Sequence, residues 1–363
     1  MGVDAASAAL TFDRNRLRTA RQLRRRSQSE LARDANVTAA AVSQYESGHA
    51  RPSPATLTRL ADALSVPPGY LARKPGEPGR PPEPFFRSLR STSSTDRYRA
   101  ASLAGLVHEL ATALDQHVAL PEPDLPGPRA VADDDDIEQA AADTRAHFDL
   151  PANGPVDNVV RQLERHGVVV ARLEVQAAKL DAFSVPYGRR PVVVLGADKN
   201  ARDRSRFDAA HELGHLVMHE TEDEAIGSRV VENEAHRFAS AFLMPADDIR
   251  PDLPARADWP VLLRLKQEWH VSIAALLRRA KDLGCMNDAA YLQAQKAISA
   301  RGWRRVEPGA LGAPEEPALL KRALEVAAVN GMTLEALAEQ HSLPLHDLKQ
   351  IVKVADSRPQ VIV

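Results

Sequence analysis

Two histidines and a glutamate lie within one short segment of the 363-residue chain. Three residues separate His211 from His215, and Glu212 follows the first histidine directly. On a helix, residues four apart lie one turn apart on the same face, so both imidazole rings can reach a single metal ion. Zinc suits such a pair, at about 2.0–2.1 Å from each ring nitrogen. Glu212 would lie beside the ion without binding it.

A glutamate in this position has a chemical use. Bound zinc lowers the pKa of a water molecule to about 7. Glu212 is then placed to take the proton from that water and to pass it to the nitrogen that departs when an amide bond is cut. The segment therefore predicts Zn2+-dependent hydrolysis of peptide bonds, with Glu212 as the general base and His211 and His215 as metal ligands.

A catalytic zinc needs a third protein ligand and an open fourth position. Glu232, at the start of a second predicted helix, is the candidate, because Ala235 and Ala239 on the same helix would allow it to pack closely on the first. Glu234 is the main competitor for this third position; the alternative role for Glu234 is to orient a histidine. We interpret His219 as a structural residue, because three ligands on one straight helix converge poorly on one ion.

The elements that must position these residues are short. Runs rich in valine predict strands at residues 168–173 and 191–195, and residues 156–166 predict a helix. The small sheet comes just before the histidine helix. A peptide substrate could pair along the edge of the strand that precedes this helix.

A separate helical module is predicted near the start of the chain. Residues 28–34 and 38–46 predict two helices joined by a tight turn, in which Asn36 can take the left-handed conformation and Thr38 can cap the following helix. In such an arrangement the helix after the turn enters the major groove of DNA.

The DNA contacts follow from this placement. Gln28 and Arg51 would contact backbone phosphates, and Gln44 could pair with adenine. The residues expected to face the bases are Thr38, Ala39, Ala40, Ser43 and Gln44.

This module resembles the XRE (lambda-repressor-like) family. The resemblance implies a five-helix bundle that binds specific sequences of double-stranded operator DNA, often as a homodimer. The motifs that carry it are Arg16-Leu17-Arg18, Ser27-Gln28-Ser29-Glu30-Leu31-Ala32, Val42-Ser43-Gln44-Tyr45-Glu46-Ser47-Gly48 and Arg51-Pro52-Ser53.

The histidine segment resembles the ImmA/IrrE family of metallopeptidases. Arg206-Phe207 before the histidines and Phe238-Ala239-Ser240-Ala241-Phe242-Leu243-Met244-Pro245 after them carry the resemblance. It implies a gluzincin-like fold, zinc bound by His211, His215 and Glu232, and cleavage of a regulatory protein such as a repressor or an antitoxin. His236 stands where the family often has asparagine. It could join the site or donate to the developing oxyanion, or simply be a polar helix residue.

The composition indicates which partners and which cellular compartment suit the protein. The first 90 residues carry 15 Lys and Arg against 8 Asp and Glu, whereas the rest carry 32 against 41. A basic module joined to an acidic body suits a protein that meets nucleic acid at one end. The single cysteine, Cys285, excludes an intrachain disulfide. We expect a cytoplasmic protein with no membrane partner, because no secretion signal or apolar run of about 20 residues is present.

The predicted fold is mainly α with a small β-sheet. It comprises a lambda-repressor-like domain at 1–74, a proline-rich linker and connecting helix at 75–130, a gluzincin-like α+β domain at 131–248 and a helical region at 249–363. The linker is a candidate for cleavage by the chain itself.

Two functions stay open: a DNA-guided zinc endopeptidase, and a non-proteolytic transcription factor whose metallopeptidase-like domain senses a metal, ligand or partner. The general base at Glu212 favours the first.

Overall fold

The structure is a computed structural model. It describes residues 3–72, 85–86, 93–173, 182–188, 190–197, 201–219 and 228–353. These residues form a mainly helical protein with one small sheet, which confirms the predicted fold class. None of the helices in these ranges has the length and apolar character needed to cross a membrane. The proline-rich run of the predicted linker, residues 75–82, lies outside the described residues.

A helical bundle opens the chain. Its turn-helix segment forms as predicted: Asn36 has a φ of 51°, and the hydroxyl of Thr38 accepts a hydrogen bond from the backbone N–H of Ala41 at 3.1 Å. Because Thr38 is the cap, the helix itself begins one residue later than predicted. The helices are α1 (Ala5–Leu10), α2 (Arg14–Leu23), α3 (Gln28–Asp34), α4 (Ala39–Ser47) and α5 (Pro54–Leu64), followed by a 3-10 turn at Pro68–Leu71.

The sheet has four strands in the order β1-β3-β4-β2. They are β1 (Phe85–Phe86), β2 (Val169–Leu173), β3 (Ala182–Val185) and β4 (Val192–Gly196). Strands β2 and β4 are parallel, and β3 is antiparallel to both β4 and β1. The two valine-rich strands were predicted to within one residue at each end, whereas β1 and β3 were not predicted.

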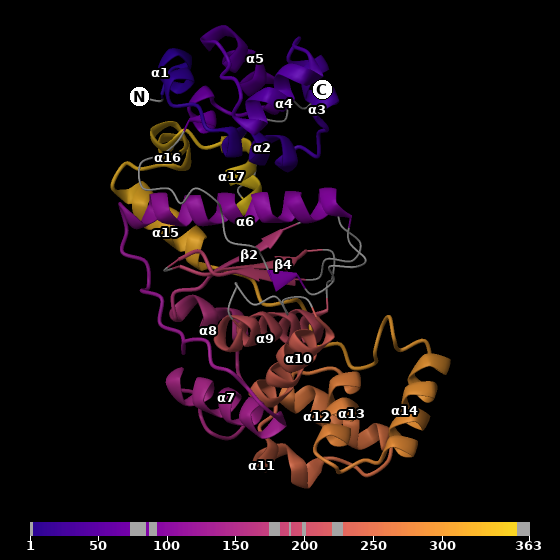
Figure 1. Cartoon of the computed structure of the whole chain (residues 1–363). Helices are drawn as coiled ribbons and strands as arrows, with labels where there is room; N and C mark the ends of the chain where they lie inside the picture. Colours follow the sequence, from indigo (N-terminus) through magenta and orange to yellow (C-terminus); the bar gives the residue numbers. More distant parts are fainter. Residues whose placement is uncertain are drawn as a thin grey trace, which may run out of the picture.

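Each face of the sheet covers a different core. Val169 and Ala171 belong to a core shared with the N-terminal bundle and with α6 (Ser94–Asp115). Val168 and Val170 belong to a second core shared with α9 (Arg202–Met218). Figure 1 shows the resulting layers, with α6 lying between the N-terminal bundle and the sheet and α9 on the opposite face.

Helices on the α9 side build the second core. They are α7 (Asp134–His147), α8 (Val159–Arg165), α10 (Arg229–Leu243), α11 (Ala246–Ile249), α12 (Trp259–Trp269), α13 (Ile273–Asp282) and α14 (Asp288–Ala300), with a 3-10 turn at Arg250–Asp252. The carboxylate of Glu307 caps α13, accepting hydrogen bonds from the backbone N–H groups of Ile273 and Ala274 at 2.7 and 3.0 Å. The segment after α14 therefore returns to this core.

The last three helices return to the N-terminal bundle. The apolar residues of α15 (Leu319–Val329), α16 (Leu334–His341) and α17 (Leu345–Ile351) belong to the first core. Arg24, the residue directly after α2, makes two hydrogen bonds to Asp347 of α17, at 2.6 and 2.7 Å. The C-terminal region predicted at 249–363 thus contributes to both cores. The division into four domains stays a prediction.

Candidate metal centre

Helices α9 and α10 bring His211, His215 and Glu232 together. Their ligand atoms all lie within 4.8 Å of one another. The two Nε2 atoms are 3.1 Å apart, and the Glu232 carboxylate oxygens lie 3.5 Å from His211 Nε2 and 3.7 Å from His215 Nε2. Both histidines are buried, and Glu232 is half-buried.

This spacing fits zinc. Four ligands arranged tetrahedrally at about 2.0–2.1 Å from one ion are about 3.3 Å from each other. The three measured separations, 3.1, 3.5 and 3.7 Å, lie around that value. Two neutral imidazoles and one carboxylate are also the donor set of a known class of catalytic zinc site, in which water or substrate takes the fourth position. The residues present therefore fit a zinc ion.

Close packing of the two helices makes this cluster possible. Gly214 lies between the two histidines on α9, and a Cβ atom added there would lie 3.0 Å from the ring of Phe238 on α10. That distance is shorter than normal carbon contacts, so a larger residue would push the helices apart. Ala235 and Ala239 are fully buried along the same helix. Small residues at these positions hold the Glu232 carboxylate near the histidines.

A second line of contacts runs outward from His215. Its Nδ1 atom lies 3.0 Å from His219 Nδ1, and His219 Nε2 lies 3.1 Å from a carboxylate oxygen of Glu234. If His215 Nε2 binds zinc, Nδ1 carries the ring proton and donates to His219, whose Nε2 then donates to Glu234. His219 and Glu234 would thus orient a ligand, in keeping with the sequence interpretation.

Glu212 is fully buried on α9, beside the cluster. Its Oε2 atom accepts a hydrogen bond from the hydroxyl of Ser184 at 2.7 Å. Ser184 lies on β3, where all four residues are buried. Sequence reasoning missed this residue; the available signal was a lone hydroxyl within a short apolar run.

His236 lies one turn after Glu232 on α10. Its ring centroid is 4.6 Å from that of Phe207 and 6.4 Å from that of His211. It therefore stands beside the cluster without being one of its three members. A role as a donor to a substrate oxygen is compatible with this position.

The expectation that a peptide substrate pairs with the strand before the histidine helix is wrong. The strand that precedes α9 is β4, and it is paired on both sides, with β2 and with β3. A peptide cannot add to it. The strand that carries Ser184 is β3, whose second edge pairs with β1, Ser184 opposite Phe85 and Phe183 opposite Phe86.

The residues expected to meet DNA are placed at the surface of the N-terminal bundle. Exposed side chains are Thr38, Ala39, Ala40, Ser43, Gln44 and Arg51. Gln28 differs, because its amide donates to Glu46 Oε2 at 2.9 Å, within a cluster that also includes Arg21. The Gln28 side chain therefore links α3 to α4 through this hydrogen bond. The DNA contacts of all seven residues stay predictions.

Two family models match the chain. Residues 17–71 match a family described as helix-turn-helix, and residues 163–281 match the IrrE N-terminal-like domain. The chain joins a helix-turn-helix domain to an IrrE N-terminal-like domain. Both resemblances noted in the sequence are thereby confirmed. No curated protein matches the chain.

The two matched ranges contain the residues of both candidate sites. The IrrE N-terminal-like match includes α9 and α10, and so contains all three members of the metal cluster together with Glu212. It continues into α13 and ends at residue 281, beyond the predicted boundary at residue 248. The helix-turn-helix match contains α3 and α4 and all seven predicted DNA contacts.

Proposed function

We propose that this chain is a DNA-binding transcriptional regulator and a zinc-dependent endopeptidase that cleaves a repressor or an antitoxin-like protein. The observation that carries the proposal is the buried Glu212 carboxylate beside the cluster of His211, His215 and Glu232. A site that only sensed a metal would need the three ligands but no general base. The helix-turn-helix domain would bring this chemistry to an operator.

The zinc ion would supply a Lewis acid and lower the pKa of a water molecule. Glu212 would take the proton from that water and deliver it to the leaving nitrogen. The hydrogen bond from Ser184 holds the Oε2 atom of this carboxylate, so that the group keeps one orientation during the transfer. His236, whose ring centroid lies 6.4 Å from that of His211, would donate a hydrogen bond to the oxygen that gains negative charge.

The edge of β3 would receive the substrate. An extended peptide can pair its backbone with a strand next to a catalytic site. At Phe183 and Ser184 this edge is paired with β1, a segment of the same chain. A protein substrate that uses this edge would have to displace β1, so the resting chain would have low activity. The segment 75–82 before β1 remains a candidate for cleavage by the chain itself.

The test uses the full chain, as wild type and as Glu212→Gln. Each is mixed with proteins encoded beside it or regulated with it, and products are identified by mass spectrometry. We expect a cleaved partner with wild type only. If zinc is bound but neither form cleaves any of these proteins, the domain is a sensor and the proposal is wrong.

A further inference from the structure

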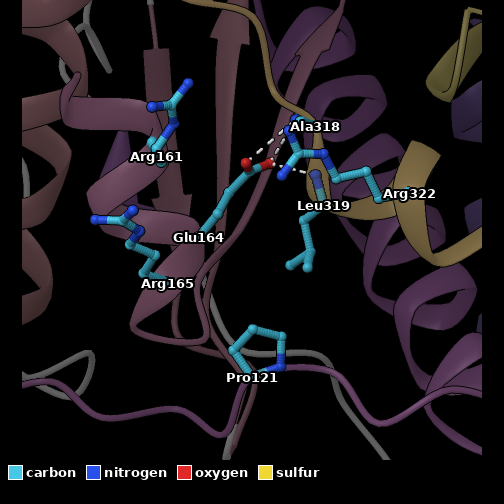
Figure 2. Close-up of a pocket in the computed structure, with 7 residues that line it drawn as sticks. All are labelled: Pro121, Arg161, Glu164, Arg165, Ala318, Leu319 and Arg322. Atoms are coloured by element: carbon cyan, nitrogen blue, oxygen red, sulfur yellow. Dashed lines mark hydrogen bonds between the residues drawn. The ribbon is translucent and has the colours of Figure 1, made fainter.

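A cavity of about 360 Å³ lies between α8 and the start of α15, away from the metal cluster. Figure 2 shows Arg161 and Arg165 on one side of it and Arg322 on the other. The volume is within the range of about 300–1,000 Å³ that small-molecule sites occupy. Nothing in the proposed peptidase chemistry uses this cavity.

The charges that line the cavity are unbalanced. It holds three guanidinium groups and a single carboxylate, Glu164. That carboxylate is already engaged: it accepts hydrogen bonds from the backbone N–H groups of Ala318 and Leu319, both at 2.9 Å, at the start of α15. Within the described residues, none of the three guanidinium groups forms a hydrogen bond or an ion pair with another side chain. The lining therefore carries an excess of positive charge, which suits an anion.

Glu164 offsets only part of this positive charge. Its residue is 8% exposed, and burial raises the pKa of this carboxyl, opposed by the hydrogen bonds from the backbone of α15. Arg322 and Arg161 favour its charged form through electrostatic attraction, whereas its hydrogen bonds come from the backbone at the start of α15. The arginines therefore keep donors for a ligand.

The rest of the lining is apolar. Leu319 and Pro121 form part of the wall. Arginine forks match the geometry of phosphate oxygens and can bind them in pairs. We propose that this cavity binds a phosphorylated small molecule, with the phosphoryl group held by Arg161, Arg165 and Arg322 and an apolar body against Leu319 and Pro121.

The cavity lies between elements that belong to different hydrophobic cores. Residues Val159, Val160 and Leu163 of α8 belong to the core around the metal cluster, whereas Leu320 and Ala323 of α15 belong to the core of the helix-turn-helix bundle. A ligand held from both sides would stabilise the contact between these two cores. The site is independent of the peptidase proposal, because it needs neither zinc nor Glu212.

Calorimetric titration of the full chain with phenyl phosphate tests the proposal at fixed ionic strength. Wild type should bind one equivalent, several-fold more tightly than it binds inorganic phosphate. The double variant Arg165→Gln/Arg322→Gln should bind at least tenfold more weakly. Arg256→Gln, which removes an exposed arginine outside the cavity, is the matched control and should bind as wild type does.

Two results would overturn the proposal. One is the absence of phenyl phosphate binding to wild type, and the other is equal binding by the double variant. A parallel titration with a short DNA duplex distinguishes another role: if the double variant loses affinity for the duplex while phenyl phosphate fails to bind wild type, the arginines contact DNA. Thermal unfolding without ligand verifies that the variants are folded.

Discussion

The hydroxyl of Ser184 on β3 donates a 2.7 Å hydrogen bond to the Oε2 atom of Glu212 on α9, and both residues are fully buried. This contact joins the central sheet to the helix that carries the two histidines. A buried carboxylate is costly unless donors satisfy it, and the serine hydroxyl supplies one such donor to the proposed general base.

Replacement of this serine should affect catalysis more than metal binding. We expect Ser184→Ala to bind zinc as wild type does and to cleave the partner protein about tenfold more slowly, since a hydrogen bond to a charged group contributes about 1.5–3 kcal/mol. Steady-state cleavage rates and zinc content measure both quantities. Ser240→Ala removes another buried serine, two turns beyond Glu232 on α10, and should leave the rate unchanged. Equal rates for the two variants would contradict this role.

His219 should tune the affinity for zinc. It contacts His215 at 3.0 Å and Glu234 at 3.1 Å, and partners of this kind typically contribute about 10–100-fold to metal affinity. We expect His219→Ala to weaken zinc binding about tenfold in a competition titration with a chelator. His346→Ala, which changes an exposed residue of α17, is the control. An unchanged zinc dissociation constant for His219→Ala would show that the contact between His219 and His215 does not contribute to zinc affinity.

The pairing of β1 with β3 should limit activity. Proline lacks the backbone N–H that a strand donates, so Phe85→Pro/Phe86→Pro should weaken this pairing and open the β3 edge. We expect the double variant to cleave its partner several-fold faster than wild type at unchanged zinc content. A slower or equal rate would mean that β1 does not compete with the substrate.

Gln44 should contribute to recognition of the operator. It is exposed on α4, and a bidentate contact of glutamine with adenine is worth about 1–3 kcal/mol. Gln44→Ala should therefore bind the operator about 10–100-fold more weakly, with little change in affinity for unrelated DNA. Fluorescence anisotropy with both duplexes measures the difference. Gln293→Ala, on α14 of the other core, should behave as wild type.

The local parts of the fold could be predicted from the sequence. Helices α3 and α4, the turn at Asn36 and the strands β2 and β4 follow from capping residues and apolar periodicity. The histidine pair follows from helical spacing alone. Such signals lie within a few adjacent residues.

Other parts depend on contacts between distant segments. The Ser184–Glu212 hydrogen bond joins residues 28 positions apart, and β1 pairs with β3 across nearly one hundred positions. The final helices pack on the N-terminal bundle through Arg24 and Asp347, 323 positions apart. No periodicity within one segment encodes these pairings, so the strands β1 and β3, the blocked edge and the shared core could not be derived.

Zinc content is the most direct test of the metal centre. Wild type, Glu212→Gln and Glu232→Ala would be purified with metal available and analysed by elemental mass spectrometry. The structure predicts one zinc ion per chain in wild type and in Glu212→Gln, and its loss or marked depletion in Glu232→Ala, because only the last variant removes a member of the cluster. Wild type without zinc, or full zinc in Glu232→Ala, would contradict the assignment of this site.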